Sequence, residues 1–352
     1  MGKGYMGKIL TVDLDTATWT EERLGDEIYE QYLAGQGLGA YILYNRIPAG
    51  ADPLGPDNLL GFMAGLLTGT GSLFSGRWTV VGKSPLTGGW GDANCGGQFA
   101  PAIKRCGYDG IFFRGVSAKP VYLLIDHDTI EIRDASRLWG KDAVETEEIL
   151  MEEHGNDARV ATIGLSGENL SLISGICNDR GRIAARSGLG AVMGSKKLKA
   201  VVLKGCRRIP TGNPLEIKGI SQKCNRWVRF DLPKWPGFLN AYLGTAVGLL
   251  PTQMAIDGFL YKVLNRIWGT GSMNQMSVGM GDSPIKNWKG TNVDWPFSKS
   301  KSVNSDVFTK CEVVKYHCYS CPLGCGGVCS SRGNIPRRTS PNTKPCWRWA
   351  AS

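Results

Sequence analysis

The sequence predicts an α+β protein, in which a strand-rich region ending near Gly205 is followed by a helical region. Short runs of β-branched and apolar residues, separated by turn residues, recur throughout the first region. Beyond the linker-like stretch Arg208–Pro214, the segment Leu215–Met280 has helical periodicity and no clear strand. A chain of 352 residues is long enough for about two domains.

The N-terminal region begins with a predicted hairpin, in which Ile9–Leu14 is followed by a polar strand through Glu22. The next segment, Asp26–Ile47, has apolar residues at helical spacing. The glycine run Gly35-Gln-Gly37-Leu-Gly39 interrupts it. Because this run follows a helical pattern rather than a strand, it does not indicate a Rossmann fingerprint.

Glycine punctuates the chain from Pro53 to Asn94, around a predicted strand at Arg77–Val81 and a turn at Lys83–Gly88. So many glycines are typical of backbone that packs closely against a flat ligand or against another backbone. They are equally typical of a β-rich domain with many tight turns. Composition alone does not decide between these interpretations.

The rest of the first region alternates predicted strands with one amphipathic helix, Asp142–His154. The predicted strands are Ile111–Arg114, Pro120–Asp126, Thr129–Arg133, Arg159–Gly164, Leu170–Cys177 and Lys199–Lys204. Between them, Asn178–Lys196 combines three arginines with a small-residue helix start. Guanidinium groups and helix N-terminal amides suit phosphate, whereas the alternative is a set of arginines in surface salt bridges.

The most informative motif is the loop Cys318-Tyr-Ser-Cys321-Pro-Leu-Gly-Cys325. Closely spaced thiolates in a glycine-containing loop favour an iron–sulfur cluster, and we expect a [4Fe–4S] cluster. Zinc is an alternative, but zinc sites usually take their ligands as two separated pairs. Unliganded or disulfide-bonded cysteines are the other alternative. Candidates for a fourth ligand are Cys311, Cys329 and Cys346, none of them at a telling spacing.

Composition argues against several classes of protein. The net charge is +10, but the basic residues are scattered and no nucleic-acid-binding motif accompanies them, so we expect no nucleic-acid partner. No apolar run reaches transmembrane length, and no signal peptide is evident, so we expect a cytoplasmic protein without a membrane anchor. In that compartment the eleven cysteines are expected as thiols and cluster ligands rather than disulfides.

Taken together, these stretches resemble the tungsten-dependent aldehyde:ferredoxin oxidoreductase family, over about Met6–Gly205 and again at the cysteine loop. The blocks that carry the resemblance occur in the same order as in that family. They are Pro53-Leu-Gly-Pro-Asp-Asn58, Gly65-Leu-Leu-Thr-Gly69, Gly76-Arg-Trp78, Lys83-Ser-Pro-Leu-Thr-Gly88, Ala93-Asn-Cys-Gly-Gly97, Gly107-Tyr-Asp109, Glu131-Ile-Arg-Asp-Ala-Ser136, Trp139-Gly-Lys141, Gly167-Glu-Asn169, Gly190-Ala-Val-Met-Gly-Ser-Lys196 and the loop with Cys318, Cys321 and Cys325.

The resemblance implies a β-sheet base for a tungsten bis-pyranopterin, with molybdenum as a possible substitute, and a nearby [4Fe–4S] cluster held by the three loop cysteines. It also implies oxidation of an aldehyde to a carboxylate, with ferredoxin or a similar carrier as electron acceptor and a homodimer or an iron–sulfur subunit as possible assembly. The residues expected to line the pterin and its phosphates are Arg77, Asn94, Gly96, Arg186, Ser187, Gly188 and Leu189. Arg77 would lie between pterin and cluster.

We therefore expect a tungstopterin-binding domain at residues 1–210 and a partial helical domain with the cysteine loop at residues 211–329. The basic segment 330–352 contains no acidic residue and departs from the family pattern. Our hypothesis is that it is out-of-frame translation, after a frameshift or a mispredicted gene end. On that interpretation the C-terminal part of the family protein is absent. The alternative function is then a catalytically inactive cofactor-binding or electron-transfer fragment.

Overall fold

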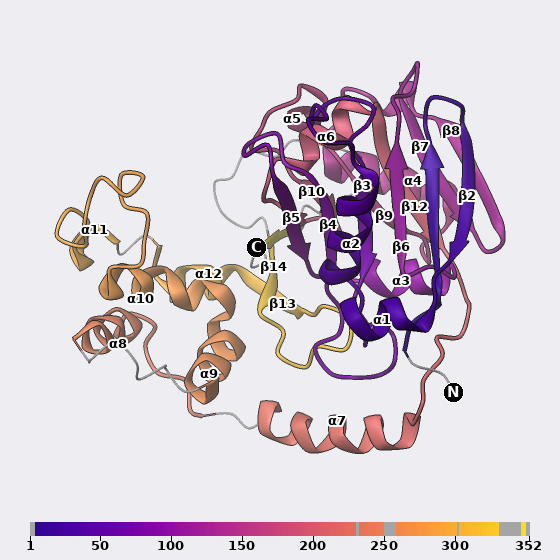
Figure 1. Ribbon diagram of the computed structural model, residues 1–352. Helices are drawn as coiled ribbons and strands as arrows, with labels where there is room; N and C mark the ends of the chain where they lie inside the picture. The colour runs from indigo at the N-terminus through magenta and orange to yellow at the C-terminus, as the bar shows by residue number, and fades with distance from the viewer. Residues whose placement is uncertain (1–3, 230–231, 250–257, 301–302, 331–345, 350–352) are drawn as a thin grey trace. The chain divides into compact units, whose positions relative to one another are not determined.

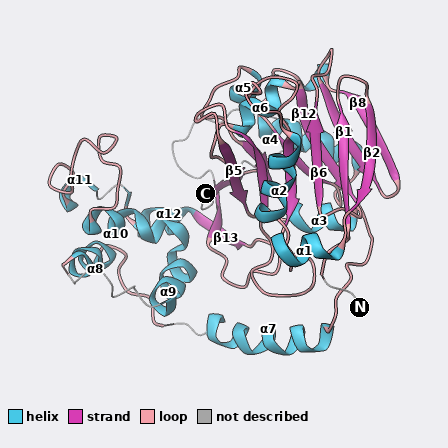
Figure 2. Ribbon diagram, in the orientation of Figure 1, coloured by secondary structure: helices cyan, strands magenta, loops and turns pink. Residues whose placement is uncertain are grey.

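The computed structural model describes residues 4–229, 232–249, 258–300, 303–330 and 346–349, which fall into two compact units (Figure 1). Unit 1 holds Met1–Gln222 together with Cys318–Cys321, and unit 2 holds Lys223–His317 and Pro322–Ala351. Most strands lie in unit 1, and unit 2 is mainly helical, as Figure 2 shows. The predicted α+β class is confirmed.

Sheet A, the first of two six-stranded sheets in unit 1, has the strand order β2-β1-β6-β3-β4-β5. Its strands are β1 (Lys8–Asp13), β2 (Thr18–Arg23), β3 (Leu60–Ala64), β4 (Trp78–Lys83), β5 (Trp90–Cys95) and β6 (Gly110–Arg114). The predicted hairpin is confirmed as β1 and β2. All of β2 is exposed, and its charged residues protect this edge of the sheet from pairing with another chain. The opposite edge is β5.

Sheet B, the second, has the order β11-β10-β9-β12-β7-β8. Its strands are β7 (Val121–Asp126), β8 (Thr129–Asp134), β9 (Arg159–Thr162), β10 (Ile176–Asn178), β11 (Arg182–Ala184) and β12 (Leu198–Lys204). Strand β7 pairs parallel with β12, and the other neighbours are antiparallel. Strand β11 ends the sheet at one edge.

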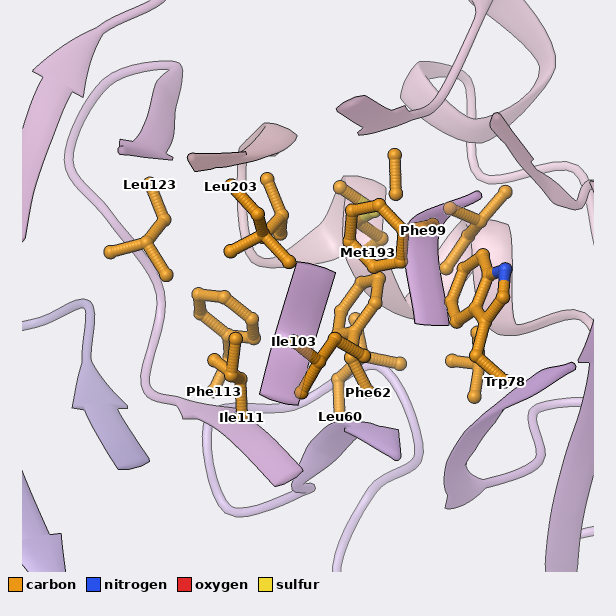
Figure 3. Packing of buried hydrophobic residues seen from close by; sticks show 14 of the residues in the cluster. Leu60, Phe62, Trp78, Phe99, Ile103, Ile111, Phe113, Leu123, Met193 and Leu203 are labelled. Atoms are coloured by element: carbon orange, nitrogen blue, oxygen red, sulfur yellow. The ribbon is translucent and has the colours of Figure 1, made fainter. Parts of the chain in front are cut away.

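The core of unit 1 lies around helix α3 (Phe99–Arg105), between side chains contributed by both sheets (Figure 3). The ring of Phe99 lies 4.8 Å from that of Trp78 on β4, centroid to centroid, and Trp78 stacks on Phe62 at 5.5 Å. Leu123 and Leu203 bring the apolar surface of sheet B to the same cluster. Because α3 is buried almost all round, it joins the two sheets rather than covering one of them.

The other helices of unit 1 are α1 (Asp26–Tyr32), α2 (Gln36–Arg46), α4 (Ala143–His154), α5 (Leu165–Glu168) and α6 (Leu189–Ser195), with a 3₁₀ turn at Ser136–Leu138. The predicted segment Asp26–Ile47 becomes two helices. Gly35, with φ of 64°, takes a left-handed conformation between them that glycine adopts without steric cost. Helix α4 begins at Ala143, one residue after the predicted start, and Asp142 is its N-cap, whose carboxylate accepts a hydrogen bond from the Glu145 amide at 2.8 Å.

One predicted strand is wrong. Leu170–Cys177 forms a turn, and only Ile176 and Cys177 of this segment enter β10. The amide of Ser171 donates to the carbonyl of Ser166 at 2.8 Å, and that of Ser174 donates to the carbonyl of Ser171 at 2.9 Å. These turn hydrogen bonds use backbone groups that a ladder would need, so the apolar run is not extended.

Unit 2 confirms the helical prediction up to Met280. Its elements are α8 (Leu239–Gly248), α9 (Gly258–Trp268), a 3₁₀ turn (Gly269–Ser272), α10 (Met273–Met280), α11 (Phe297–Ser300), α12 (Ser305–Cys311), and the strands β13 (Glu312–Tyr316), β14 (Gly326–Ser330) and β15 (Cys346–Trp349). Helix α7 (Pro214–Arg229) runs from unit 1 into unit 2. The three-stranded sheet β13-β14-β15 was not anticipated. None of the described helices has the length and apolar character needed to cross a bilayer.

Much of the segment 330–352 lies outside the described residues, so its expected origin stays a prediction. Its residues Cys346–Trp349 form β15, which pairs with β14.

Lys196, directly after α6, is fully buried. Its ammonium group donates to the carbonyl oxygens of Gly115 at 3.2 Å and Pro56 at 3.4 Å. Burial lowers the pKa of Lys196 to about 8, because the charged form loses its hydration.

Replacing Lys196 by methionine should remove a pH dependence from the stability of unit 1. Between the folded pKa of about 8 and the ordinary value of 10.5, the unfolded chain keeps a proton that the folded protein releases. The free energy of unfolding of the wild type should therefore rise, relative to Lys196→Met, as pH increases through this window. Denaturant unfolding should show a gain of about 1–3 kcal/mol. A difference that stays constant with pH would contradict the assignment.

Candidate functional site

A cavity of about 360 Å³ in unit 1 takes its lining from β5, from Arg77 next to β4, and from β11 with the two residues after it. Strand β5 is an edge of sheet A and β11 is an edge of sheet B. The six lining residues are Arg77, Asp92, Asn94, Ile183, Ala185 and Arg186. The cavity is therefore polar and mixed in charge, with two guanidinium groups, one carboxylate and one amide.

Arg77 directly precedes β4, and its side chain is held by Asn94 on β5. The guanidinium Nε donates to Asn94 Oδ1, and Nη2 donates to the Asn94 carbonyl oxygen at 3.1 Å. Asn94 in turn donates from Nδ2 to the hydroxyl of Thr79 at 3.2 Å. Since a guanidinium carries five N–H groups, three remain for a ligand. The carboxamide thus fixes one edge of the guanidinium and leaves the other free.

Arg186 lies after β11, at the start of the turn that leads into α6. Ser187 and Gly188 have left-handed φ values of 62° and 66°. The Ser187 hydroxyl donates to the carbonyl oxygen of Asp92 at 3.0 Å, and Ser84 donates to the carbonyl oxygen of Ser187 at 2.9 Å. These bonds tie the turn to β5 and to the residue that follows β4. Arg186 itself is exposed and has no hydrogen-bond or ion-pair partner among the described residues.

The structure brings three of the seven expected cofactor residues, Arg77, Asn94 and Arg186, to one cavity. Ser187 and Gly188 continue from Arg186 as the turn before α6. The Leu189 side chain is completely buried in the hydrophobic core, so only its backbone, at the N-terminus of α6, could contact a ligand. Gly96, the remaining residue, does not line the cavity and lies instead beneath the cysteine loop.

Sequence reasoning missed Asp92, Ile183 and Ala185 as cavity residues. Asp92 had a usable signal. Asp92 and Asn94 are two positions apart on β5, so they share one face of the strand. The Asp92 carboxylate has no hydrogen-bond or ion-pair partner within the described part of the chain.

The first part of the cysteine loop, Cys318–Cys321, belongs to unit 1 and is held there by hydrogen bonds of its backbone. The Tyr319 amide donates to the carbonyl of Gly97 at 2.9 Å, and the Phe74 amide donates to the carbonyl of Ser320 at 3.0 Å. A Cβ placed on Gly96 would stand 2.5 Å from Cys318 Sγ and 3.8 Å from Arg77 Nη1. Cys318 thus lies against a surface that only glycine leaves open, on the same side as the free edge of Arg77.

The described residues contain no group of three or more His, Cys, Asp or Glu side chains arranged to hold a metal ion. Cys318 and Cys321 belong to unit 1, whereas Cys325 belongs to unit 2. The side chains of Cys311, Cys329 and Cys346, the candidates for a fourth ligand, lie outside those described. The expected cluster therefore stays a prediction.

Two thiols elsewhere in unit 1, the buried Cys95 and the half-buried Cys177, are poor metal ligands. Burial raises the pKa of Cys95 to about 12 and that of Cys177 to about 11, because a thiolate would lose its hydration. Cys95 Sγ lies 3.1 Å from Asn178 Oδ1 and donates to it. These cysteines remain protonated near neutral pH, unlike a metal-binding thiolate.

Comparison with known proteins now identifies the family. The sequence profile of the aldehyde ferredoxin oxidoreductase N-terminal domain matches residues 9–205, more than half of the chain. The chain belongs to the aldehyde ferredoxin oxidoreductase family. A second profile, for domains 2 and 3 of aldehyde ferredoxin oxidoreductase, matches residues 260–345 and takes in part of the basic segment.

The family relatives include tungsten-containing aldehyde ferredoxin oxidoreductases from two archaea. The Thermococcus kodakarensis protein is 38% identical over 92% of this chain and 49% of its own length. The Pyrococcus furiosus protein is 37% identical over 99% of this chain and 53% of its own length. Another Pyrococcus furiosus relative, the aliphatic sulfonate oxidoreductase, WOR-like subunit, is 32% identical over 91% of this chain. The chain thus spans about half the length of the curated relatives it matches.

A solved structure shares the fold. It is the active site complex BamBC of benzoyl coenzyme A reductase with 1,5-dienoyl-CoA, and one of its chains superposes with a TM-score of 0.74 and 30% identity. The alignment covers all of this chain and 50% of that one. The fold of this chain is therefore shared by about half of a chain that has a different name.

The family implies a tungsten–pterin cofactor, and the residues around the cavity fit such a group. Among the residues that the structure describes, Arg186 has a guanidinium without a partner and Arg77 has N–H donors left over. Guanidinium groups bind phosphate through paired hydrogen bonds, and the turn before α6 adds backbone amides. The unpaired carboxylate of Asp92 can accept hydrogen bonds from the amino and ring N–H groups of a pterin.

Gly96→Ala should displace the cysteine loop, because the added methyl group would overlap Cys318 Sγ. Overpacking of this kind costs about 1–3 kcal/mol. The rate of Cys318 alkylation, followed by mass spectrometry of the peptide, should rise at least about fivefold. Gly89→Ala is the matched control, since its Cβ would meet only Thr87 Oγ1 at an ordinary 3.9 Å. Equal alkylation rates in the two variants would show that Gly96 does not support the loop.

Proposed function

We propose that this chain supplies the cofactor-holding part of a tungsten bis-pyranopterin oxidoreductase that oxidises an aldehyde to its carboxylate. Water would provide the added oxygen, and the electrons would pass through a [4Fe–4S] cluster to ferredoxin. The observation that carries the proposal is the convergence of Arg77, Asn94 and Arg186 on one cavity. Membership of the family indicates which ligand this cavity would hold, namely the pterin of a tungsten cofactor.

The proposal gives each cavity residue a separate task. Arg186 binds a phosphate of the pterin, while the Ser187–Leu189 turn offers backbone N–H groups beside it. Asn94 orients Arg77, whose remaining N–H groups reach toward the pterin and toward Cys318. When bound, the tungsten–pterin group supplies two-electron redox chemistry at the substrate carbon. Molybdenum is the competing metal at the same site.

The cluster would be held by Cys318, Cys321 and Cys325. The spacing of the three thiols supports this cluster. The position of Cys318 supports it further, because its Sγ lies near the Arg77 guanidinium. An N–H donor near a cluster sulfur stabilises the reduced, more negative state and tunes its potential. This gives Arg77 a role between the two cofactors.

The aldehyde substrate and the ferredoxin partner are inferred from the archaeal relatives at 38% and 37% identity, whose names state them. Relatives named for aliphatic sulfonates and for benzoyl coenzyme A set the competing substrate classes. The BamBC complex and the relative described as a subunit favour an assembly with another subunit over a chain that works alone. A homodimer and an iron–sulfur partner subunit both stay predictions. The cytoplasmic location stays a prediction from the sequence.

Arg186→Ala should lower the tungsten and pterin content of the purified full chain. The lost contact is charge-assisted and worth about 1.5–3 kcal/mol, which corresponds to a roughly tenfold or greater loss of affinity. The measurement is elemental analysis together with pterin fluorescence, on protein expressed in a host that makes tungstopterin. Arg23→Ala, at an exposed arginine on β2, is the control and should retain wild-type content.

The same preparations are assayed for aldehyde-dependent reduction of ferredoxin. Wild-type protein that lacks tungsten and pterin altogether would reject the cofactor role. Tungsten and pterin without any aldehyde oxidation would instead favour the alternative, a cofactor-binding or electron-transfer fragment. Turnover of a sulfonate or a coenzyme A thioester in place of the aldehyde would overturn the substrate assignment alone.

Anaerobic reconstitution should load the full chain with iron and sulfide rather than zinc, because the cysteine loop has no second ligand pair. The broad visible absorption of the cluster should appear in the wild type and be lost in Cys321→Ser. Cys224→Ser, at an exposed cysteine on α7, should leave the absorption unchanged. One zinc per chain without iron or sulfide would refute the cluster.

A further inference from the structure

The side chains of Thr79, Asn94 and Arg77 form a short chain of hydrogen bonds across β4 and β5. Thr79 lies opposite Asn94 in the register of the two strands, and its hydroxyl accepts from Asn94 Nδ2 at 3.2 Å. Asn94 presents Oδ1 and its backbone carbonyl to Arg77. Each partner of Asn94 thus uses a different side of the amide, which gives that amide one orientation.

The orientation of Asn94 decides where the guanidinium of Arg77 points. With Nε and one N–H of Nη2 engaged by Asn94, the rotation of the guanidinium about its stem is restricted. Nη1 then faces the point 3.8 Å away at which a Gly96 Cβ would stand, and Cys318 Sγ lies 2.5 Å from the same point. Arg77 lines the cavity as well. A flipped amide would place Nδ2 against Nε, donor against donor, and release the guanidinium.

We propose that Thr79 is a positioning residue that acts through Asn94 to hold Arg77 between the cavity and Cys318. The proposal rests on the proposed function, because it gives Arg77 cofactors to bridge. Thr79 itself is only 6% exposed, on β4 between the core residues Trp78 and Val80. It belongs to the strand framework rather than to the exposed rim of the site. Such a residue fixes geometry without touching the ligand.

The hydroxyl of Thr79 is the group that matters. Thr79→Val keeps the β-branched shape but removes the acceptor, so Asn94 Nδ2 loses its partner and the amide is free to rotate. Thr79→Ser keeps the acceptor and removes the methyl group. A role in positioning therefore predicts rescue by serine, whereas a role in packing predicts that valine is the better tolerated variant.

The test uses the full, metal-free chain labelled with ¹⁵N at arginine. The Arg77 Nε–H signal is assigned by its absence in Arg77→Lys, and its hydrogen-exchange rate is measured in the wild type, Thr79→Val and Thr79→Ser. We expect exchange to be about fivefold faster in Thr79→Val, as for the loss of one hydrogen bond of ordinary strength. Thr79→Ser should exchange at close to the wild-type rate.

A second readout uses protein reconstituted with iron and sulfide. If Arg77 donates toward Cys318, Thr79→Val should lower the cluster potential, because a misplaced donor no longer stabilises the reduced state, and Thr79→Ser should restore it. Iron content should be equal in all three proteins. The exchange measurement needs no cofactor, so it judges the role of Thr79 even if the wild type binds neither iron nor tungsten and the proposed function fails.

An unchanged exchange rate of Arg77 Nε–H in Thr79→Val would overturn the proposal. Equal acceleration in the valine and serine variants would also overturn it, since the methyl group rather than the hydroxyl would then hold the site. If Thr79→Val folds poorly, Thr79→Ser still tests the proposal. Its Arg77 Nε–H exchange rate must equal that of the wild type, and a faster rate would overturn the proposal.

Discussion

The packing of α3 between two sheets is the constraint on which the rest of unit 1 depends. Phe99 contacts Trp78 from sheet A, and the same cluster includes Leu203 from sheet B. Burial of a large apolar side chain contributes about 1.5–3 kcal/mol, and truncation of Phe or Trp to Ala costs about 3–5 kcal/mol. Because one helix serves both sheets, the edge strands β5 and β11 come to line the same cavity. The functional surface is thus a consequence of the core.

Hydrogen bonds then refine what the core assembles. Asn94 and Ser187 occupy equivalent places in this respect, since each ties an arginine-bearing segment to a neighbouring strand. Both arginines are exposed at the cavity, as is Asn94, whereas Ser187 is half-buried. A ligand that binds here meets one guanidinium, that of Arg77, whose conformational entropy is already reduced, so that less free energy is lost on ordering it.

The sequence was sufficient to predict local features and insufficient for those created by long-range pairing. The β-branched and aromatic content of runs such as Ile111–Arg114 is enough to predict a strand. Helix α3 has no such signal, because a helix buried on all sides shows no apolar periodicity. Resemblance placed Arg77 and Arg186 in one site, but the contribution of Asp92 depends on which strands form edges. The contact of Cys318 with Gly96 joins residues more than two hundred positions apart, beyond any local pattern.

The docking of the cysteine loop has an evolutionary consequence, since its hydrogen bonds to unit 1 use the backbone of Tyr319 and Ser320. Neither hydrogen bond requires a particular side chain at these positions. Tyr319 also places its ring 5.9 Å from the Arg105 guanidinium, and Ser320 has a positive φ of 55°. The supporting surface has no such freedom, because Gly76 and Gly96 lie so close to the loop that any Cβ would collide with it. Substitutions should thus be more frequent at the two loop positions than at the two glycines beneath them.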